Sequence, residues 1–205
     1  MTRIKVCGVT TESDADAIVA LGVELIGINL VPSSPRCVRF EQARRLVAAV
    51  HGRAEVVLVV ADRNPTELRS LKRELGADSL QLHGEEPPEV LEVLDAVDYK
   101  ALRIATADDV ARAAAYGGKR LLVDAKVPGT LGGSGRVFDW GLVRELAHER
   151  QLLLAGGLKP ENVSDAIETV HPWGVDTASG VELQPGVKDL QRVERFVERV
   201  RAGLV

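Results

Sequence analysis

The feature that most constrains the fold is a strict alternation of apolar runs and helix-like segments along the whole chain. The apolar runs are short and show little polar alternation, which is typical of strands buried on both faces of a parallel sheet. We predict strands at Ile4–Cys7, Glu24–Leu30, Val56–Val60, Ser79–Leu82, Tyr99–Arg103, Arg120–Asp124, Gln151–Leu154 and Trp173–Asp176. Between and after them we predict helices at Thr10–Ala20, Glu41–Val50, Pro65–Leu75, Pro87–Leu94, Ala107–Ala115, Asp139–His148, Pro160–Thr169 and Asp189–Val200.

Eight strand–helix units with short connections indicate parallel strands joined by right-handed crossovers. Within 205 residues, this number of units fits a closed (β/α)8 TIM barrel. An open doubly wound sheet is the alternative, but such sheets usually have fewer strands, and their G-x-G-x-x-G motif does not follow the first strand here. No shift in composition marks a second domain, so we predict a single α/β barrel domain over residues 1–205.

Charge and composition exclude several classes of partner. Lys and Arg number 26 against 30 Asp and Glu, a net charge of -4 with no basic run, which argues against nucleic-acid binding. The longest uncharged stretch, Leu25–Pro35, is too short to span a bilayer, and no apolar signal segment follows Met1. We therefore expect no membrane association and a cytoplasmic location. The two cysteines and four histidines lack metal-ligand spacing.

In a barrel of this kind the loops after the strands converge at one end, where active sites form. Gly156-Gly157 follows the seventh predicted strand, and Ser179-Gly180 follows the eighth. Such glycines can simply permit tight turns. On adjacent strands, however, their uncovered backbone N–H groups match the recurrent phosphate site of this architecture. We therefore predict a phosphate-binding barrel whose ligand is a small phosphorylated metabolite.

Two candidates for acid–base chemistry stand at strand ends. Cys7 ends the first strand, and Lys5 lies two residues earlier on the same strand face. Its positive charge is expected to lower the thiol pKa from about 8.5 toward neutrality, as a general base requires. Asp124 ends the sixth strand and could flank a ligand opposite Cys7. An inert buried thiol and a loop-capping carboxylate are the alternatives.

Three further polar residues are candidates for binding the ligand. Arg36 follows a proline in the loop after the second strand, and its guanidinium could grip a carboxylate. His83 follows the fourth strand, where it could contact a ligand or hydrogen-bond its own loop. Asp176, at the end of the eighth strand, is also counted as a substrate-binding candidate.

These residues lie in short motifs which, in this order, resemble the phosphoribosylanthranilate isomerase family over essentially the whole chain. The motifs are Lys5-Val6-Cys7-Gly8-Val9-Thr10, Ser34-Pro35-Arg36, Gln81-Leu82-His83-Gly84, Leu122-Val123-Asp124 with Gly132-Gly133-Ser134-Gly135, Gly156-Gly157-Leu158, and Val175 to Glu182. The resemblance implies a phosphate-binding (β/α)8 barrel. It also implies an Amadori rearrangement in tryptophan biosynthesis, from N-(5-phosphoribosyl)anthranilate to 1-(2-carboxyphenylamino)-1-deoxyribulose 5-phosphate, without metal or organic cofactor.

The resemblance further implies a role for each motif residue. Cys7 would be the general base at ribose C2′, and Asp124 the general acid at the furanose ring oxygen. Arg36 would hold the anthranilate carboxylate. The backbone around Gly156, Gly157, Ser179 and Gly180 would hold the phosphate.

The chain departs from the family pattern at Asn29, at Ala61-Asp62 and at Ala178, which affects the expected packing around the substrate rather than the reaction. Another phosphate-binding barrel, such as indole-glycerol-phosphate synthase, and a catalytically silent phosphosugar-binding barrel are the rival functions. The glycines and Pro128 of residues 125–136 predict a mobile lid. The sequence leaves both a monomer and a homodimer open.

Overall fold

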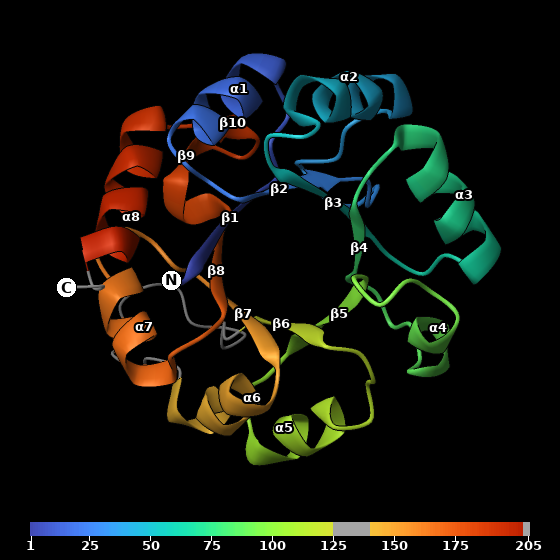
Figure 1. Cartoon of the computed structure of the whole chain (residues 1–205), viewed down its shortest axis with the longest axis vertical. Helices are drawn as coiled ribbons and strands as arrows, with labels where there is room; N and C mark the ends of the chain where they lie inside the picture. Colours follow the sequence, from blue (N-terminus) through green and yellow to red (C-terminus); the bar gives the residue numbers. More distant parts are fainter. Residues whose placement is uncertain (125–139, 203–205) are drawn as a thin grey trace.

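The computed structural model describes residues 1–124 and 140–202. Eight parallel strands close into a barrel in the order β1 to β8, with β8 hydrogen-bonded to β1, and helices surround the barrel (Figure 1). The strands are β1 (Arg3–Cys7), β2 (Leu25–Asn29), β3 (Glu55–Val60), β4 (Ser79–Leu82), β5 (Tyr99–Arg103), β6 (Arg120–Asp124), β7 (Gln151–Ala155) and β8 (Gly174–Thr177). The predicted closed barrel is therefore confirmed, and the open sheet is excluded.

The helices follow the strands in the predicted alternation. They are α1 (Glu12–Ala20), α2 (Phe40–Val50), α3 (Pro65–Leu75), α4 (Glu89–Glu92), α5 (Ala107–Ala113), α6 (Arg144–Glu149), α7 (Val163–Val170) and α8 (Leu190–Ala202), with 3-10 turns η1 (Trp140–Val143) and η2 (Ser179–Val181).

Local chemistry explains why α3 begins and ends where the sequence predicts. Pro65 occupies the first turn, where its missing N–H leaves no bond unmade. The Asn64 side chain accepts a hydrogen bond from the Glu67 backbone, and the Glu67 carboxylate accepts one from the Asn64 backbone. Gly76 ends the helix in the left-handed region at φ 70°.

Other predicted boundaries were wrong by a few residues. The expected helix Pro87–Leu94 is reduced to α4, because the turns around it are closed by bonds between residues three apart, such as Val90 N to Pro87 O. The predicted Asp139–His148 helix begins as the 3-10 turn η1 and becomes α-helical only at Arg144. The predicted lid at 125–136 lies outside the described residues.

A short hairpin that the sequence analysis missed follows β8. It consists of β9 (Glu182–Gln184) and β10 (Val187–Lys188), which pair antiparallel. Pro185-Gly186 between them is a turn signal, and Gly186 adopts φ 84°. This hairpin reaches the loop after β1, since the Thr10 hydroxyl donates a hydrogen bond to the Gly186 carbonyl at 2.5 Å.

Apolar side chains form two cores, one on each side of the barrel wall. In β3, Val57 points into the barrel, while Val56, Leu58 and Val60 belong to the larger core between the strands and the helices. Both faces of this strand are buried, which explains its lack of polar alternation. The interior core consists of Leu25, Val57, Tyr99, Ala101, Leu122, Leu153 and Ala155, with Trp173 packed against it.

The amino end of the barrel is closed by a stacked cation. The guanidinium carbon of Arg120 lies 4.6 Å from the ring centroid of Trp173 and 5.3 Å from that of Tyr99. Arg120 also pairs with Glu55, which accepts a hydrogen bond from the Ser79 hydroxyl at 2.7 Å. Arg120 and Glu55 therefore find partners within the barrel wall itself, although the Nε atom of Arg120 is buried without a hydrogen-bond partner among the described residues.

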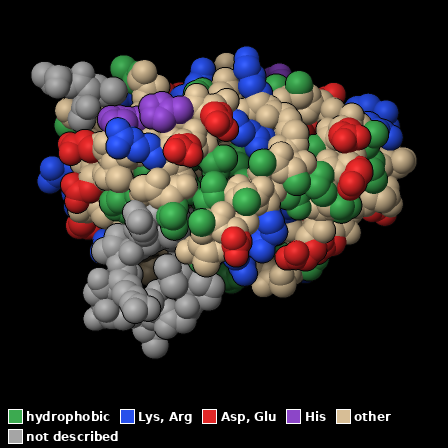
Figure 2. Space-filling model, turned by 90° about the horizontal axis from the view of Figure 1, so that it is seen from below, with side chains coloured by type: hydrophobic (Ala, Val, Ile, Leu, Met, Phe, Trp, Pro, Cys, Tyr) green, Lys and Arg blue, Asp and Glu red, His purple; other side chains and the backbone are tan. Residues whose placement is uncertain are grey.

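On the side of the molecule seen in Figure 2, acidic and basic side chains are interspersed over the surface. Within residues 1–124 and 140–202, no helix is long and apolar enough to cross a membrane.

Candidate active site

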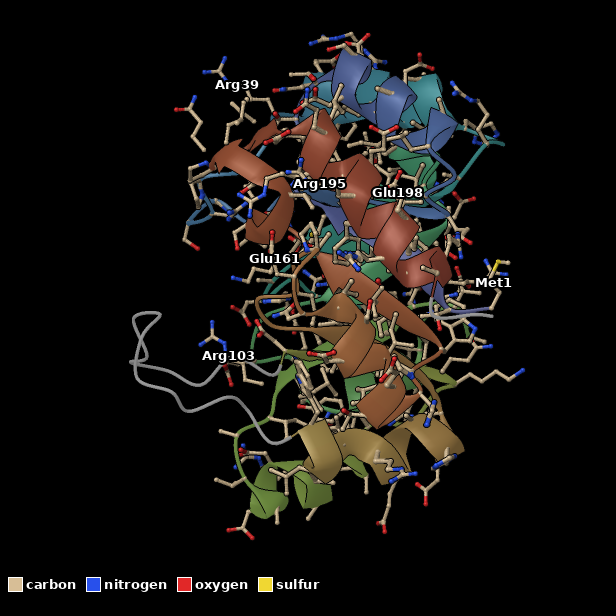
Figure 3. The ribbon with its side chains drawn as sticks, turned by 90° about the vertical axis from the view of Figure 1, so that its left-hand side faces the viewer. Met1, Arg39, Arg103, Glu161, Arg195 and Glu198 are labelled. Carbon is tan, nitrogen blue, oxygen red and sulfur yellow. The ribbon has the colours of Figure 1, made fainter. Side chains whose placement is uncertain are left out.

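The carboxyl ends of the strands surround a cavity of about 540 Å³. All nine candidate residues from the sequence line it, namely Cys7, Arg36, His83, Asp124, Gly156, Gly157, Asp176, Ser179 and Gly180. Arg103, at the end of β5, also lines the cavity and lies on the opposite side of the barrel from Met1 (Figure 3). The barrel thus brings together residues from strands and loops spread over most of the chain.

Cys7 shares its corner of the cavity with a buried ion pair. Lys5 Nζ lies 3.0 Å from Asp176 Oδ1, on the neighbouring strand β8. A Cβ atom on Gly27 would lie 2.9 Å from Cys7 Sγ and 3.0 Å from Lys5 Nζ. The absence of a side chain at position 27 therefore makes room for the thiol and the ammonium group side by side.

The expected lowering of the Cys7 pKa is wrong. Burial raises the pKa of the thiol above its ordinary value, although the positive charges of Lys5 and Lys188 oppose the rise. The Asp176 carboxylate beside Lys5 also raises the thiol pKa, because it offsets part of the lysine charge. The prediction that Lys5 lies near Cys7 is correct. Desolvation of the thiolate nevertheless raises the Cys7 pKa by more than the Lys5 charge lowers it.

Lys5 itself stays protonated. Burial alone would lower its pKa, but the charges of Asp176 and Cys7 raise it above the ordinary value. Burial raises the pKa of Asp176, and Lys5 limits that rise. The pair is therefore held together inside the barrel wall, with Asp176 facing the cavity.

His83 is oriented by a chain of two hydrogen bonds from the barrel interior. The Tyr99 hydroxyl donates to Gln81 Oε1 at 3.3 Å, which leaves the Gln81 amide nitrogen to donate to His83 Nδ1 at 3.0 Å. This assignment puts the imidazole proton on Nε2. Desolvation by the barrel wall lowers the His83 pKa, against the opposing charge of Asp124. Among the residues that the structure describes, the Nε2–H of His83 has no acceptor, so a neutral imidazole presents this donor to the cavity that it lines.

Arg36 is held by a carboxylate that the sequence analysis left without a role. Its Nε donates to both Glu182 oxygens at 2.9 and 3.1 Å, and its Nη2 donates to Oε2 at 2.6 Å. A Cβ on Gly8 would lie 2.4 Å from Arg36 Cδ, so the glycine lets the arginine cross the end of β1. The side chain of Arg36 remains 20% exposed, toward the cavity that it lines.

The two glycine loops touch each other beside the cavity. Gly156 and Gly157 adopt φ values of 102° and 78°, which favour glycine. A Cβ on Gly180 would lie 1.9 Å from the Leu158 carbonyl oxygen, so only glycine allows η2 to approach the loop after β7 this closely. The Thr177 hydroxyl donates to the same carbonyl at 2.7 Å. Backbone segments from both loops therefore line one wall of the cavity.

Asp124 ends β6, in register with Arg103 of β5 and Ala155 of β7. It lines the same cavity as Cys7 of β1, and β7 and β8 separate the two strands in the closed barrel. The carboxyl group of Asp124 and the thiol of Cys7 therefore lie at the wall of one cavity.

Of the residues that differ from the family pattern, Asp62 has the clearest structural role. It adopts a φ of 54°, and its carboxylate accepts a hydrogen bond from the Glu85 backbone at 2.7 Å. It thereby ties the loop after β3 to the loop after β4. Asn29 accepts a similar bond from the Val31 backbone at 2.8 Å.

Among the described residues, no group of three or more His, Cys, Asp or Glu side chains is arranged to hold a metal ion.

The barrel and its polar cavity define the class of protein: a (β/α)8 barrel with the site architecture of an enzyme at the carboxyl ends of its strands. The family model described as N-(5'phosphoribosyl)anthranilate (PRA) isomerase matches residues 4–199, and the chain belongs to this family.

Several relatives are similar over nearly their whole length. The N-(5'-phosphoribosyl)anthranilate isomerase of Myxococcus xanthus is 42% identical, covering 98% of this chain and 96% of the relative. That of Pseudomonas aeruginosa is also 42% identical, covering 98% and 95%.

Solved structures agree with these relatives. The phosphoribosyl anthranilate isomerase of Thermotoga maritima superposes with a TM-score of 0.91 at 35% identity, covering 98% of this chain and 100% of that one. A phosphoribosyl anthranilate isomerase in complex with reduced 1-(o-carboxyphenylamino)-1-deoxyribulose 5-phosphate superposes with a TM-score of 0.88 at 32% identity, covering 98% and 100%.

Proposed function

We propose that this chain catalyses the Amadori rearrangement of N-(5-phosphoribosyl)anthranilate to 1-(2-carboxyphenylamino)-1-deoxyribulose 5-phosphate, a step of tryptophan biosynthesis. The observation that carries the proposal is a single cavity lined by a thiol, a carboxyl group, a guanidinium group and two glycine loops. The membership of the chain in the isomerase family supports the same reaction.

The first step opens the furanose ring. Asp124 acts as the general acid and gives its proton to the ring oxygen, so the bond from that oxygen to C1′ breaks. The lone pair of the anthranilate nitrogen forms a double bond to C1′, which leaves a cationic imine. Asp124 is then a carboxylate.

The second step moves a proton from C2′. The Cys7 thiolate takes this proton, and the electrons of the C–H bond form a double bond between C1′ and C2′ while the imine nitrogen regains its lone pair. The resulting enolamine then takes up a proton at C1′ and loses the proton of its C2′ hydroxyl, which gives the C2′ ketone of the product. Lys5 and Lys188 favour the thiolate that this step needs, against the effect of burial.

The remaining cavity residues hold the two ends of the substrate. Arg36 binds the anthranilate carboxylate, and the backbone around Gly156, Gly157, Ser179 and Gly180 binds the phosphate. The Nε2–H of His83 serves as a donor to the substrate, and Asp176 adds a polar contact while it holds Lys5.

The test is to follow the fluorescence decrease as freshly made phosphoribosylanthranilate is consumed by the purified protein. Turnover by the wild-type chain supports the proposal, and its absence contradicts it. Cys7→Ala is the matched variant, because alanine fills most of the same buried space without an ionisable group. Its turnover should fall about 10²–10⁴-fold, whereas full activity would return Cys7 to an inert buried thiol.

A second variant tests the binding assignments. Arg36→Met should weaken binding of the anthranilate end more than binding of ribose 5-phosphate, because only the former carries a carboxylate. Equal losses for both ligands would contradict the assigned role.

We further propose that the chain works as one domain over residues 1–205 in the cytoplasm. A homodimer stays a prediction for sedimentation analysis. One of the similar structures is described as a monomer generated from the dimeric enzyme of Thermotoga maritima.

A further inference from the structure

The hairpin after β8 carries a buried lysine that the mechanism above uses only through its charge. The Lys188 side chain is fully buried, and its ammonium group has three acceptors. It donates to the Cys7 carbonyl at 2.6 Å, to Glu182 Oε1 at 2.9 Å and to the Ala178 carbonyl at 3.3 Å. Burial lowers the pKa of Lys188, and the hydrogen bond and charge of Glu182 oppose that fall. Three acceptors match the three N–H bonds of a protonated amine, so the geometry favours the charged form.

Glu182 lies between this lysine and Arg36. Its carboxylate is 3% exposed and accepts hydrogen bonds from both cations, and from the Gly186 backbone at 3.2 Å. Although burial alone would raise the pKa of Glu182, the bonds from Arg36 and Lys188 hold it below the ordinary value. The three side chains therefore form a charged row of Lys188, Glu182 and Arg36, which we call the Arg36 clamp.

The clamp leaves one end of the guanidinium for a ligand. Glu182 occupies the edge formed by Nε and Nη2. Among the described residues, Nη1 of Arg36 has no hydrogen-bond acceptor, and the side chain lines the cavity. The edge formed by Nη1 and Nη2 can thus present two parallel N–H groups to a carboxylate.

The charges within the clamp decide whether that edge attracts an anion. An arginine paired with one glutamate would form a neutral pair, which has little net attraction for a second carboxylate. Lys188 adds a second cation behind the glutamate, so one net positive charge remains.

We propose that Lys188 and Glu182 are positioning residues that make Arg36 a receptor for the substrate carboxylate: Glu182 sets the direction of the guanidinium, and Lys188 keeps the clamp cationic. This inference rests on the proposed reaction, because it assumes a substrate with a carboxylate at this end. The same lysine also fixes the end of β1 through its hydrogen bond to the Cys7 carbonyl. Figure 1 shows the hairpin of β9 and β10 near β1.

The test compares two ligands that differ only in that carboxylate. One is reduced 1-(2-carboxyphenylamino)-1-deoxyribulose 5-phosphate, and the other is its phenylamino counterpart. Dissociation constants are measured by calorimetry for the wild type, Lys188→Met, Glu182→Gln and the double variant. We expect Lys188→Met to raise the dissociation constant of the carboxylate ligand roughly tenfold or more, with a much smaller change for the phenylamino ligand.

The double variant separates charge from shape. Lys188→Met leaves a neutral clamp, whereas Glu182→Gln with Lys188→Met again leaves one net positive charge at Arg36. Binding of the carboxylate ligand should therefore recover relative to Lys188→Met alone. Equal weakening of both ligands, or no recovery in the double variant, would overturn the proposal and leave Lys188 with a purely structural role.

Glu182→Gln alone decides the matter if Lys188→Met does not fold. The amide oxygen of glutamine can still accept a hydrogen bond from the Arg36 guanidinium and so keep its direction, while the clamp becomes more positive. The preference for the carboxylate ligand should therefore stay the same or increase, and a fall would overturn the proposal. Isomerase turnover is followed separately in the wild type. If the wild type and the variants bind the two ligands as described but the wild type shows no turnover, the proposed reaction is wrong. The proposed role of Lys188 and Glu182 in carboxylate binding then still holds.

Discussion

The two ends of the barrel use buried charges in opposite ways. At the amino end, the guanidinium of Arg120 lies over the rings of Tyr99 and Trp173 and forms an ion pair with Glu55. The charge of Arg120 is therefore balanced by residues of the barrel wall. At the carboxyl end, Lys5 and Arg36 are also paired, but Arg36 itself and Asp176, the partner of Lys5, line a cavity of about 540 Å³. Ionisable groups line a hollow at each end, Arg3 and Glu55 at the amino end and Asp124, Asp176 and Arg36 at the carboxyl end. The two cations differ in that Arg36 lines its hollow, whereas Arg120 is not among the residues that line either one.

This difference indicates how one scaffold separates stability from chemistry. A charge enclosed by rings and a carboxylate contributes mainly to folding, and its removal leaves a partner unpaired. A charge at a cavity wall can act on a ligand, and its environment sets its pKa. Substitutions at the amino end should therefore change unfolding, whereas substitutions at the carboxyl end should change turnover.

The largest effect is expected at the carboxyl end, for Asp124→Asn. Asparagine keeps the shape of the side chain but cannot supply the acidic proton, so kcat should fall about 10²–10⁴-fold. The free energy of unfolding and the affinity for the reduced product should stay close to the wild-type values. Turnover assays with urea unfolding would check both, and unchanged turnover would remove Asp124 from the acid role.

At the amino end, Arg120→Met should lower the free energy of unfolding by about 2–3 kcal/mol, because it leaves Glu55 without its cation and removes the stacked group. Its kcat should stay within about twofold of the wild type, as for a substitution away from the site. Arg120→Lys is the control, since it keeps the charge. A large loss of kcat in a folded Arg120→Met protein would show that the two ends are coupled.

The pH dependence should show the environment of Cys7. A general base must be ionised, and the thiolate fraction rises about tenfold per pH unit below the thiol pKa. Because burial raises this pKa, kcat/KM should keep rising into the alkaline range instead of levelling near neutrality. Measuring kcat/KM from pH 6 to 10 tests this; a plateau already at pH 7 would mean that Lys5 and Lys188 outweigh burial.

The smallest effect is expected for Arg3→Met, also at the amino end. Like Arg120, Arg3 lies over the ring of Trp173, with its guanidinium carbon 5.2 Å from the ring centroid. Unlike Arg120, Arg3 is exposed to solvent. An exposed cation–π contact contributes about 0.5–1 kcal/mol, so the loss of stability should be well below that of Arg120→Met. If Arg3→Met and Arg120→Met lowered the free energy of unfolding equally, burial of the arginine would not determine how much its contacts stabilise the fold.

Much of the fold and of the site could be predicted from sequence because both depend on local patterns. Apolar runs such as Val56–Val60 identified the strands, and a polar residue directly after such a run marked the rim of the barrel. Cys7, Asp124 and Asp176 stand at such strand ends, and the other candidates come from the segments that follow strands; all nine line the cavity. The hairpin of β9 and β10 was missed, since its strands are too short to show a period.

Other features depend on partners far apart in the chain. The direction of the Cys7 pKa shift could not be predicted from Lys5 alone, because desolvation and the Asp176 carboxylate also act on the thiol. The roles of Glu182 and Lys188 were likewise hidden, since their partners Arg36 and Cys7 are more than a hundred residues away.

The sequence by itself determined the order of strands and helices, the closed parallel barrel and the set of residues at its rim. These follow from short-range periodicity and from the rule that parallel strands share one carboxyl end. The tertiary structure alone decided which charges neutralise one another, how far each is desolvated, and which edge of Arg36 stays open. Those quantities depend on distances across the barrel, and electrostatic energies change steeply with distance and burial.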